Sequence, residues 1–197
     1  KFVLLNFLSI LYTIPKLLII AFKKNNYINL TFSSKKLKKR KDVYRVNSNF
    51  DSDLIWDPII PLPFINNKVK SIYSINFLDK LPLNLIEKHI HNCKNLLIED
   101  GKYILSVKDA SAYIFAYTNN NYSLFHEHHK KNNLAKYGFI DQINIIYREG
   151  NKTLFDEEFI KNLFLKNGFR RIVTREFNFN FDIPQSFHDS IYFIAYK

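Results

Sequence analysis

Residues 62 to 114 read LPFINNKVKSIYSINFLDKLPLNLIEKHIHNCKNLLIEDGKYILSVKDASAYI. Within this stretch, VKSIYSI at 69–75 is a short apolar run typical of a central strand. LNLIEKHIHNCKNLL at 83–97 repeats its apolar residues at helical spacing. It ends at Asp100-Gly101, where glycine can take the left-handed conformation that closes a helix. KYILSVKD at 102–109 predicts the next strand, so the stretch is a strand–helix–strand unit.

The sequence on both sides extends this alternation of strands and helices. A second helix is predicted at 156–169, with Asp156 as its N-cap and Gly168 as its stop. The pattern predicts one α/β sheet with helices on its faces. Further strands are predicted at 27–32, 42–47, 52–57, 170–179 and 190–197.

The first 22 residues form an apolar segment with polar interruptions. Lys16 would lie near the centre of a membrane span, where a charge costs about 3 kcal/mol. We expect a helix broken near Pro15 that packs on the domain or rests on a membrane surface, and a transmembrane anchor is the alternative. We therefore divide the chain into an apolar helical segment, 1–26, and one domain, 27–197. Because the chain contains no methionine, we also expect residues to precede Lys1.

The chain is basic, with 29 Lys and Arg against 18 Asp and Glu and a net charge of +11. Its one dense cationic run, KKLKKRKD, begins at Lys35. Such a run indicates either a solvated loop or an anionic partner such as nucleic acid, acidic glycan or a membrane surface. No nucleic-acid recognition motif is visible, so nucleic acid is not the expected partner. The single cysteine, Cys93, fits a reducing compartment, and we expect a cytoplasmic protein that contacts membranes peripherally through residues 1–22.

Several motifs occur in an order that resembles the class I S-adenosylmethionine-dependent methyltransferases, in particular a subgroup associated with glycan synthesis. The resemblance covers residues 28 to 197. It implies a Rossmann-like α/β sheet of seven strands, mostly parallel with an antiparallel last strand, and helices on both faces. The motifs are LPFINNKVK at 62–70, NFLDKL at 76–81, LIEDGKYIL at 97–105, VKD at 107–109 and TLFDEEFIKNLFLKNGF at 153–169.

The resemblance also implies a function and a site. It implies methyl transfer from S-adenosylmethionine to a small molecule or glycan intermediate, which the segment 110–150 would cover. No catalytic base is identified by the motifs. The residues expected to line the cofactor cleft are Thr31, Ser33, Asn47, Asp57 and Ser74.

The sequence departs from the family pattern at the expected cofactor cleft. No glycine precedes Gly101, and the glycine-rich turn of the family is replaced by Thr31, Phe32, Ser33 and Ser34. The threonine and phenylalanine are expected to crowd the cleft, and neither accepts a positive φ cheaply. Asn47 replaces an acidic residue that binds the ribose hydroxyls. The alternative function is therefore a degenerate methyltransferase fold that serves as a binding or scaffolding protein.

Three further departures and two histidine motifs complete the candidate chemistry. Lys80, Lys108 and Asn151 replace His, Pro and His of the family motifs. FHEHH at 125–129 could bind a metal ion, but its spacing does not place two histidines on one helical face, and we expect a polar loop and no metal site. His89 and His91 are expected on the surface of the 83–97 helix.

Overall fold

The computed structural model describes residues 2–22, 27–33, 43–48, 52–119, 144, 147, 150–184 and 189–197, with side chains from Ile10 onward. The predicted strands and helices are largely confirmed, with changes at several of their boundaries. The helices are α1 (Phe2–Phe22), η1 (Leu78–Lys80), α2 (Leu83–Leu96), α3 (Ala110–Thr118) and α6 (Glu157–Lys166). The strands are β1 (Ile28–Ser33), β2 (Val43–Asn47), β3 (Leu54–Ile55), β4 (Val69–Ile75), β5 (Leu97–Lys108), β6 (Arg171–Thr174) and β7 (Ser190–Tyr196).

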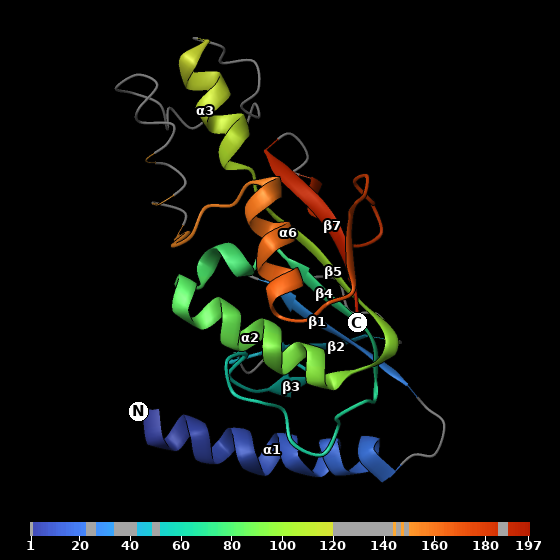
Figure 1. Ribbon diagram of the computed structural model, residues 1–197. Helices are drawn as coiled ribbons and strands as arrows, with labels where there is room; N and C mark the ends of the chain where they lie inside the picture. Colours follow the sequence, from blue (N-terminus) through green and yellow to red (C-terminus); the bar gives the residue numbers. More distant parts are fainter. Residues whose placement is uncertain are drawn as a thin grey trace.

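The strands form one seven-stranded sheet in the order β3-β2-β1-β4-β5-β7-β6 (Figure 1). Strands β1 to β5 pair in parallel, and β7 runs antiparallel to both β5 and β6. The expected fold class is therefore confirmed.

The register of the sheet separates its two faces. Leu30, Ile72 and Tyr103 lie side by side on β1, β4 and β5. This set faces α2 and α6, because the Tyr103 ring stacks on Phe164 of α6 with 5.1 Å between centroids. Figure 1 shows both helices in front of the sheet. The neighbouring positions, which include Thr31 and Tyr73, face the other way.

Helix α6 has the ends that its sequence predicts. The Asp156 carboxylate accepts a hydrogen bond from the backbone N–H of Phe159 at 2.7 Å, which satisfies one of the free donors of the first turn. Gly168 has φ +81° and follows the last turn, as predicted. A Cβ on Gly168 would meet only the mobile end of the Lys94 side chain, so glycine is favoured here by its conformation and not by lack of space.

The junction of α2 and β5 differs from the prediction, because β5 follows α2 directly. Asp100, not Gly101, takes the left-handed conformation, with φ +61°. Both residues belong to β5, and a Cβ on Gly101 would lie 2.8 Å from the carbonyl oxygen of Ile98. The glycine therefore permits a close approach of two backbone segments, and β5 begins before the predicted residue 102.

Helix α1 is continuous through Pro15, so the predicted break is wrong. Its packing on the domain is confirmed, because Leu17 and Ile20 are buried in the main core. The Thr13 hydroxyl donates to the carbonyl of Ile55 at 2.9 Å and accepts from its N–H at 3.0 Å. These two bonds fix α1 to the edge strand β3.

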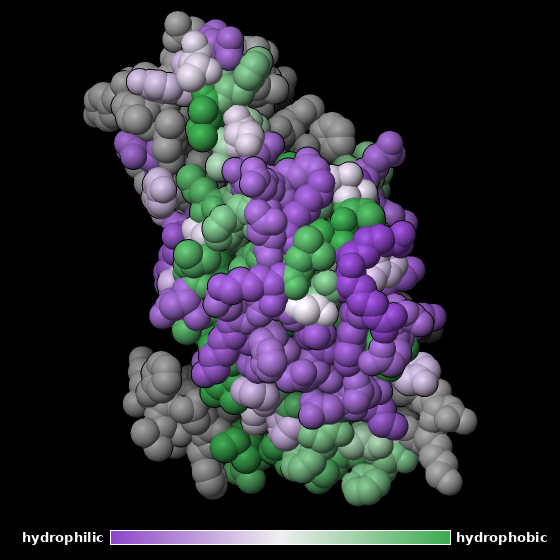
Figure 2. Space-filling view, viewed as in Figure 1, coloured by the Kyte–Doolittle hydropathy of each residue, from purple (hydrophilic) through white to green (hydrophobic). Residues whose placement is uncertain are grey.

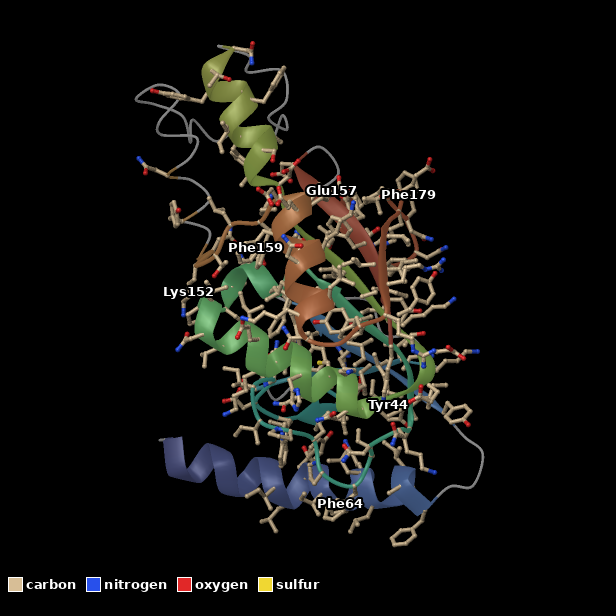
Figure 3. All side chains as sticks on the ribbon, in the orientation of Figure 1. Tyr44, Phe64, Lys152, Glu157, Phe159 and Phe179 are labelled. Carbon is tan, nitrogen blue, oxygen red and sulfur yellow. The ribbon has the colours of Figure 1, made fainter. Side chains whose placement is uncertain are left out.

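The surface around α1 differs from the surface around the other helices. In Figure 2, hydrophilic side chains cover much of the face over α2 and α6, whereas the lower margin, where α1 lies, is hydrophobic. Phe64 lies at the same end of the molecule (Figure 3). It is 56% exposed and has φ +68°, a conformation that costs energy for a phenylalanine.

Candidate functional site

The candidate site lies at the carboxyl ends of β1 and β4. The chain passes from β1 outward to β2 and β3 and then returns to β4 on the other side of β1. The strand order therefore reverses between β1 and β4. In open α/β sheets, ligands bind at such a reversal, outside the carboxyl ends of the strands.

Two of the predicted residues, Thr31 and Ser33, lie together on β1 and on the same face of the sheet. Both are largely buried. Within the part of the chain that the structure describes, the Thr31 hydroxyl oxygen is buried and makes no hydrogen bond. A buried hydroxyl without a partner is costly, so this position is suited to a group that would approach it.

Phe32 does not crowd the cleft, contrary to the prediction. It points to the opposite face, is 2% exposed, and packs on Phe77 and His89 with ring centroids 5.7 and 4.8 Å away. Thr31, Phe32 and Ser33 are all strand residues, and none of them has a positive φ. Strand β1 thus extends through the positions where the sequence predicted a turn, and Ser34 lies outside the described residues.

Asn47 is the last residue of β2 and pairs with Ile55 of β3, and Asp57 lies two residues after β3. The Asn47 side-chain carbonyl accepts a hydrogen bond from the Ser48 N–H at 2.7 Å. One lone pair of its carbonyl oxygen is thus used, and its amide group remains as a donor. One oxygen of the Asp57 carboxylate accepts from the Ile59 N–H at 3.0 Å, which leaves its second oxygen available for other donors.

Ser74, the fifth predicted residue, lies apart from Thr31 and Ser33. It pairs with Phe32 in the register of the sheet and is fully buried on the side of α2. All five residues therefore lie near the carboxyl ends of β1 to β4, but Ser74 is on the α2 side of the sheet, whereas Thr31 and Ser33 are on the opposite side.

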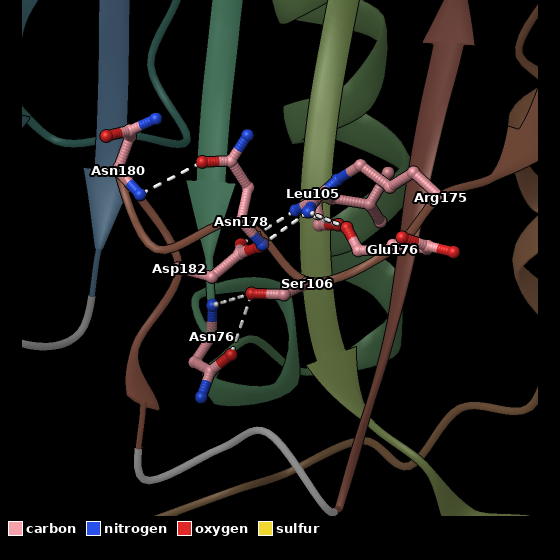
Figure 4. Close-up of polar contacts among 8 residues, drawn as sticks. All are labelled: Asn76, Leu105, Ser106, Arg175, Glu176, Asn178, Asn180 and Asp182. Carbon is pink, nitrogen blue, oxygen red and sulfur yellow. Dashed lines mark hydrogen bonds and ion pairs between the residues drawn. The ribbon is translucent and has the colours of Figure 1, made fainter.

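Asn76 is a residue of this edge that the sequence analysis missed. It directly follows β4 and has φ +47°, and asparagine is among the few residues that tolerate this conformation. Its side-chain carbonyl accepts from the Ser106 hydroxyl at 2.9 Å (Figure 4), and its N–H donates to the Ser106 carbonyl at 3.0 Å. These bonds join the ends of β4 and β5, and an asparagine directly after a predicted strand is the signal that could have identified it.

The chain between β6 and β7 folds back over the face of the sheet that carries Thr31 and Tyr73. Arg175 forms two hydrogen bonds to the Asp182 carboxylate, at 2.5 and 2.7 Å, and one to the carbonyl of Leu105 at 3.3 Å (Figure 4). Phe181 packs on Tyr73 of β4, with centroids 5.2 Å apart. Because Arg175 turns the chain inward, β6 ends at Thr174 and not at the predicted residue 179.

The departures from the family motifs contact other residues of this chain. The substituted positions are Lys80, Lys108 and Asn151. The Lys80 amine donates to the side-chain carbonyl of Asn151. The third, Lys108, forms a buried ion pair with Asp189, which also accepts from the Tyr113 hydroxyl at 2.8 Å. The three substitutions therefore make structural contacts beside the candidate site.

His89 is fully buried, so its predicted surface position is wrong, whereas His91 is exposed as predicted. The His89 Nδ1 donates to the Pro58 carbonyl at 2.8 Å, and the His89 Nε2 lies 3.0 Å from the Tyr103 hydroxyl. Because a carbonyl can only accept, the proton is on Nδ1 and Tyr103 donates to Nε2. Burial lowers the pKa of His89 to about 4, so the ring is neutral at pH 7.

Cys93 lies in the same buried group, with its sulfur 3.4 Å from Nε2 of His89. Burial raises the pKa of the Cys93 thiol well above its ordinary value. Since the thiolate is the reactive form, this cysteine is chemically inert in the folded chain. Cys93 thus serves as a small buried side chain of the core.

Several other expectations concern residues that the structure does not describe. These are the metal motif at 125–129, the basic run at 35–42 and most of the expected acceptor cover at 110–150. Among the described residues, no group of three or more His, Cys, Asp or Glu could hold a metal ion. In the same part of the chain, no helix has the length and apolar character needed to cross a membrane.

Comparison with known proteins identifies the fold. No family model and no curated protein matches the sequence. Among solved structures, a candidate O-methyltransferase from Nostoc punctiforme is 11% identical, with a TM-score of 0.51 and 94% of this chain covered. A possible exported protein from Bordetella parapertussis is 10% identical, with a TM-score of 0.52 and 96% covered.

These comparisons also differ in how much of each relative they match. The chain spans 56% of the Nostoc protein and 69% of the Bordetella protein. A methyltransferase that depends on S-adenosylmethionine, from Archaeoglobus fulgidus, is matched over 90% of its length at 10% identity and a TM-score of 0.49. Together with the strand order, the similarities to the Nostoc and Bordetella proteins show that the chain has a Rossmann-like methyltransferase fold.

Proposed function

We propose that this chain is an S-adenosylmethionine-dependent methyltransferase that acts on a small molecule or glycan intermediate. The observation that carries the proposal is the reversal of strand order between β1 and β4, with polar residues at the strand ends around it. Thr31 supports it further, because its buried hydroxyl makes no hydrogen bond to any described residue. A ligand that reaches this hydroxyl would remove an energetic cost that the fold carries.

The residues at this edge fit part of the cofactor. The free oxygen of Asp57 can accept from a ribose hydroxyl or an adenine amine, and the Asn47 amide can donate to a ribose oxygen. Ser33 and the backbone before Asn76 would contact the amino-acid end. The bound cofactor would supply an electrophilic methyl group, and the residues of this chain would orient it.

The second candidate function is a binding or scaffolding protein with a degenerate methyltransferase fold. The observation in its favour is the pair of side chains at Thr31 and Ser33, where the resemblance implies glycines. Asn47 also favours this function. Its carbonyl oxygen already accepts from the Ser48 N–H, whereas a ribose diol is held best by a group with two free acceptor atoms.

Calorimetric titration with S-adenosylmethionine and S-adenosylhomocysteine distinguishes these functions. If the chain is an enzyme, at least one of them binds with a Kd below about 1 mM, which corresponds to roughly 4 kcal/mol. Asp57→Asn then weakens binding about tenfold, because one charge-assisted hydrogen bond is lost. The control is Asp100→Asn, an exposed carboxylate at the amino end of β5, which leaves the Kd unchanged.

Absence of binding below about 1 mM would contradict the enzyme and favour the scaffolding protein. In that case Ser33→Gly tests whether the Ser33 side chain prevents cofactor binding. Glycine at the last position of β1 opens the edge without interrupting the strand. Recovery of binding in this variant would identify the serine side chain as the obstacle.

A further inference from the structure

The outward side of α1 is apolar. The α1 outer face consists of Leu11, Pro15, Ile19 and Phe22, whose spacing places them on one side of a helix. Leu11, Ile19 and Phe22 are 59, 60 and 82% exposed. The opposite side, with Leu17 and Ile20, is the one that packs on the domain. Helix α1 is therefore apolar on two sides, although the domain covers only one of them.

Phe64 is a further exposed apolar residue, at the end of the molecule where α1 lies. Phe64 is held in a left-handed conformation and is 56% exposed (Figure 3). A contiguous apolar surface of this kind marks a site of interaction with a protein or a membrane.

The distribution of charge selects between these partners. Residues 1–41 contain ten Lys or Arg and no Asp or Glu, whereas residues 42–197 contain nineteen Lys or Arg and eighteen Asp or Glu. Six of the ten cations of residues 1–41 lie at 35–41, after β1, and three others, Lys1, Lys23 and Lys24, flank α1 in the sequence. Two lysines, Lys23 and Lys24, follow Phe22 directly in the sequence.

Lys16 does not interrupt the outer face of α1. Its amine donates to the carbonyl of Asp53 at 3.0 Å and lies 3.5 Å from the centre of the Tyr12 ring. The only charged side chain between Ile10 and Phe22 is therefore bonded to the domain.

We propose that the α1 outer face docks the protein on an anionic lipid bilayer. An apolar helix face flanked by cationic residues is the combination that binds the interface of such membranes. The apolar side chains enter the boundary between headgroups and acyl chains, and the lysines attract the acidic headgroups. Helix α1 would lie in the plane of the membrane, with the sheet above it. A second copy of the chain fits less well, because it would bring two strongly cationic segments together.

Flotation of the purified chain with vesicles tests this proposal. One set of vesicles contains phosphatidylcholine and phosphatidylserine, and the other contains phosphatidylcholine alone. We expect the chain to float with the anionic vesicles, and we expect high salt to weaken this binding through screening. The double variant Ile19→Ser/Phe22→Ser loses at least about tenfold in vesicle affinity, because two exposed apolar side chains no longer enter the bilayer.

The matched control is Ile114→Ser/Phe115→Ser, which changes the same two residue types at exposed positions of α3. It is expected to bind vesicles like the unmodified chain. The proposal is overturned if the unmodified chain does not float with anionic vesicles, or if the α1 variant binds as well as the control. It is also overturned if sedimentation without lipid shows a dimer that the α1 variant dissociates. Circular dichroism of both variants verifies that they are folded.

Discussion

At the scale of single residues, His89 links the stability of the fold to pH. Its ring is fully buried among aromatic side chains and keeps both nitrogens bonded in the neutral form. Protonation would place a charge in this core and remove the acceptor for the Tyr103 hydroxyl. Burial therefore lowers the pKa of His89 to about 4, and the protonated form is favoured only in the unfolded chain.

We expect the contribution of His89 to stability to be complete above its ordinary pKa of 6.5 and to be lost as the pH falls towards 4. In this window the unfolded chain binds a proton at His89 and the folded chain does not, so acid favours unfolding. The full loss amounts to about 3 kcal/mol. Urea denaturation at a series of pH values measures the free energy of unfolding.

Two histidine variants isolate this effect. His89→Gln removes the titrating group and is expected to flatten the dependence on pH, although it also destabilises the fold at pH 7. His91→Gln changes an exposed histidine two residues away and should retain the original dependence. Equal slopes for the unmodified chain and His89→Gln would show that His89 is not the responsible group.

At the scale of elements, a buried ion pair joins the end of β5 to the start of β7. Lys108 and Asp189 have side chains that are 7 and 4% exposed. The N–H of Asp109 also donates to the carbonyl of Asp189 at 2.9 Å. In such a pair, removal of one partner leaves an uncompensated charge in the core, which costs more than the pair itself contributes.

Lys108→Met is expected to destabilise the fold by about 3 to 5 kcal/mol, because Asp189 then stays buried without its cation. The double variant Lys108→Met/Asp189→Leu should recover most of this loss. Urea denaturation of the single and double variants measures both effects.

The comparison for this pair is Lys161→Met, which breaks an exposed ion pair with Glu157 on α6 and should cost less than about 1 kcal/mol. If Lys108→Met costs no more than Lys161→Met, the buried pair does not hold β5 and β7 together.

The sequence predicted the elements because each of them has a local pattern. The apolar run at 69–75 and the capped helix after Asp156 are examples, and their boundaries are nearly as predicted. The errors occur where tertiary contacts decide. The end of β6 depends on Arg175 binding Asp182 and Leu105, and the continuity of α1 through Pro15 accompanies its packing on β3.

The candidate site was predictable only in part, for a similar reason. Motif order placed Ser33, Asn47 and Asp57 near strand ends, and the sheet brings these ends to one edge. Which side chains share a face depends on register, so Phe32 and Ser74 could not be assigned from motifs. The pair of Lys80 and Asn151 spans 71 residues, and no local pattern indicates a contact of that kind.

At the scale of the whole molecule, the two proposed functional surfaces lie at separate sites. The carboxyl ends of β1 and β4 form the candidate cofactor site, and α1 at the β3 edge presents the apolar outer face. Because different residues form them, cofactor binding and membrane docking can be tested independently.

We expect a methyltransferase cofactor to bind at the carboxyl ends of β1 and β4. Amide proton–nitrogen correlation spectra, recorded while S-adenosylhomocysteine is added, locate this binding. We expect the largest shifts at Ser33, Asn47 and Asn76, and little change at the amino ends of β1 and β4, at Ile28 and Val69. Shifts concentrated at the amino ends, or no shifts at millimolar ligand, would contradict this expectation.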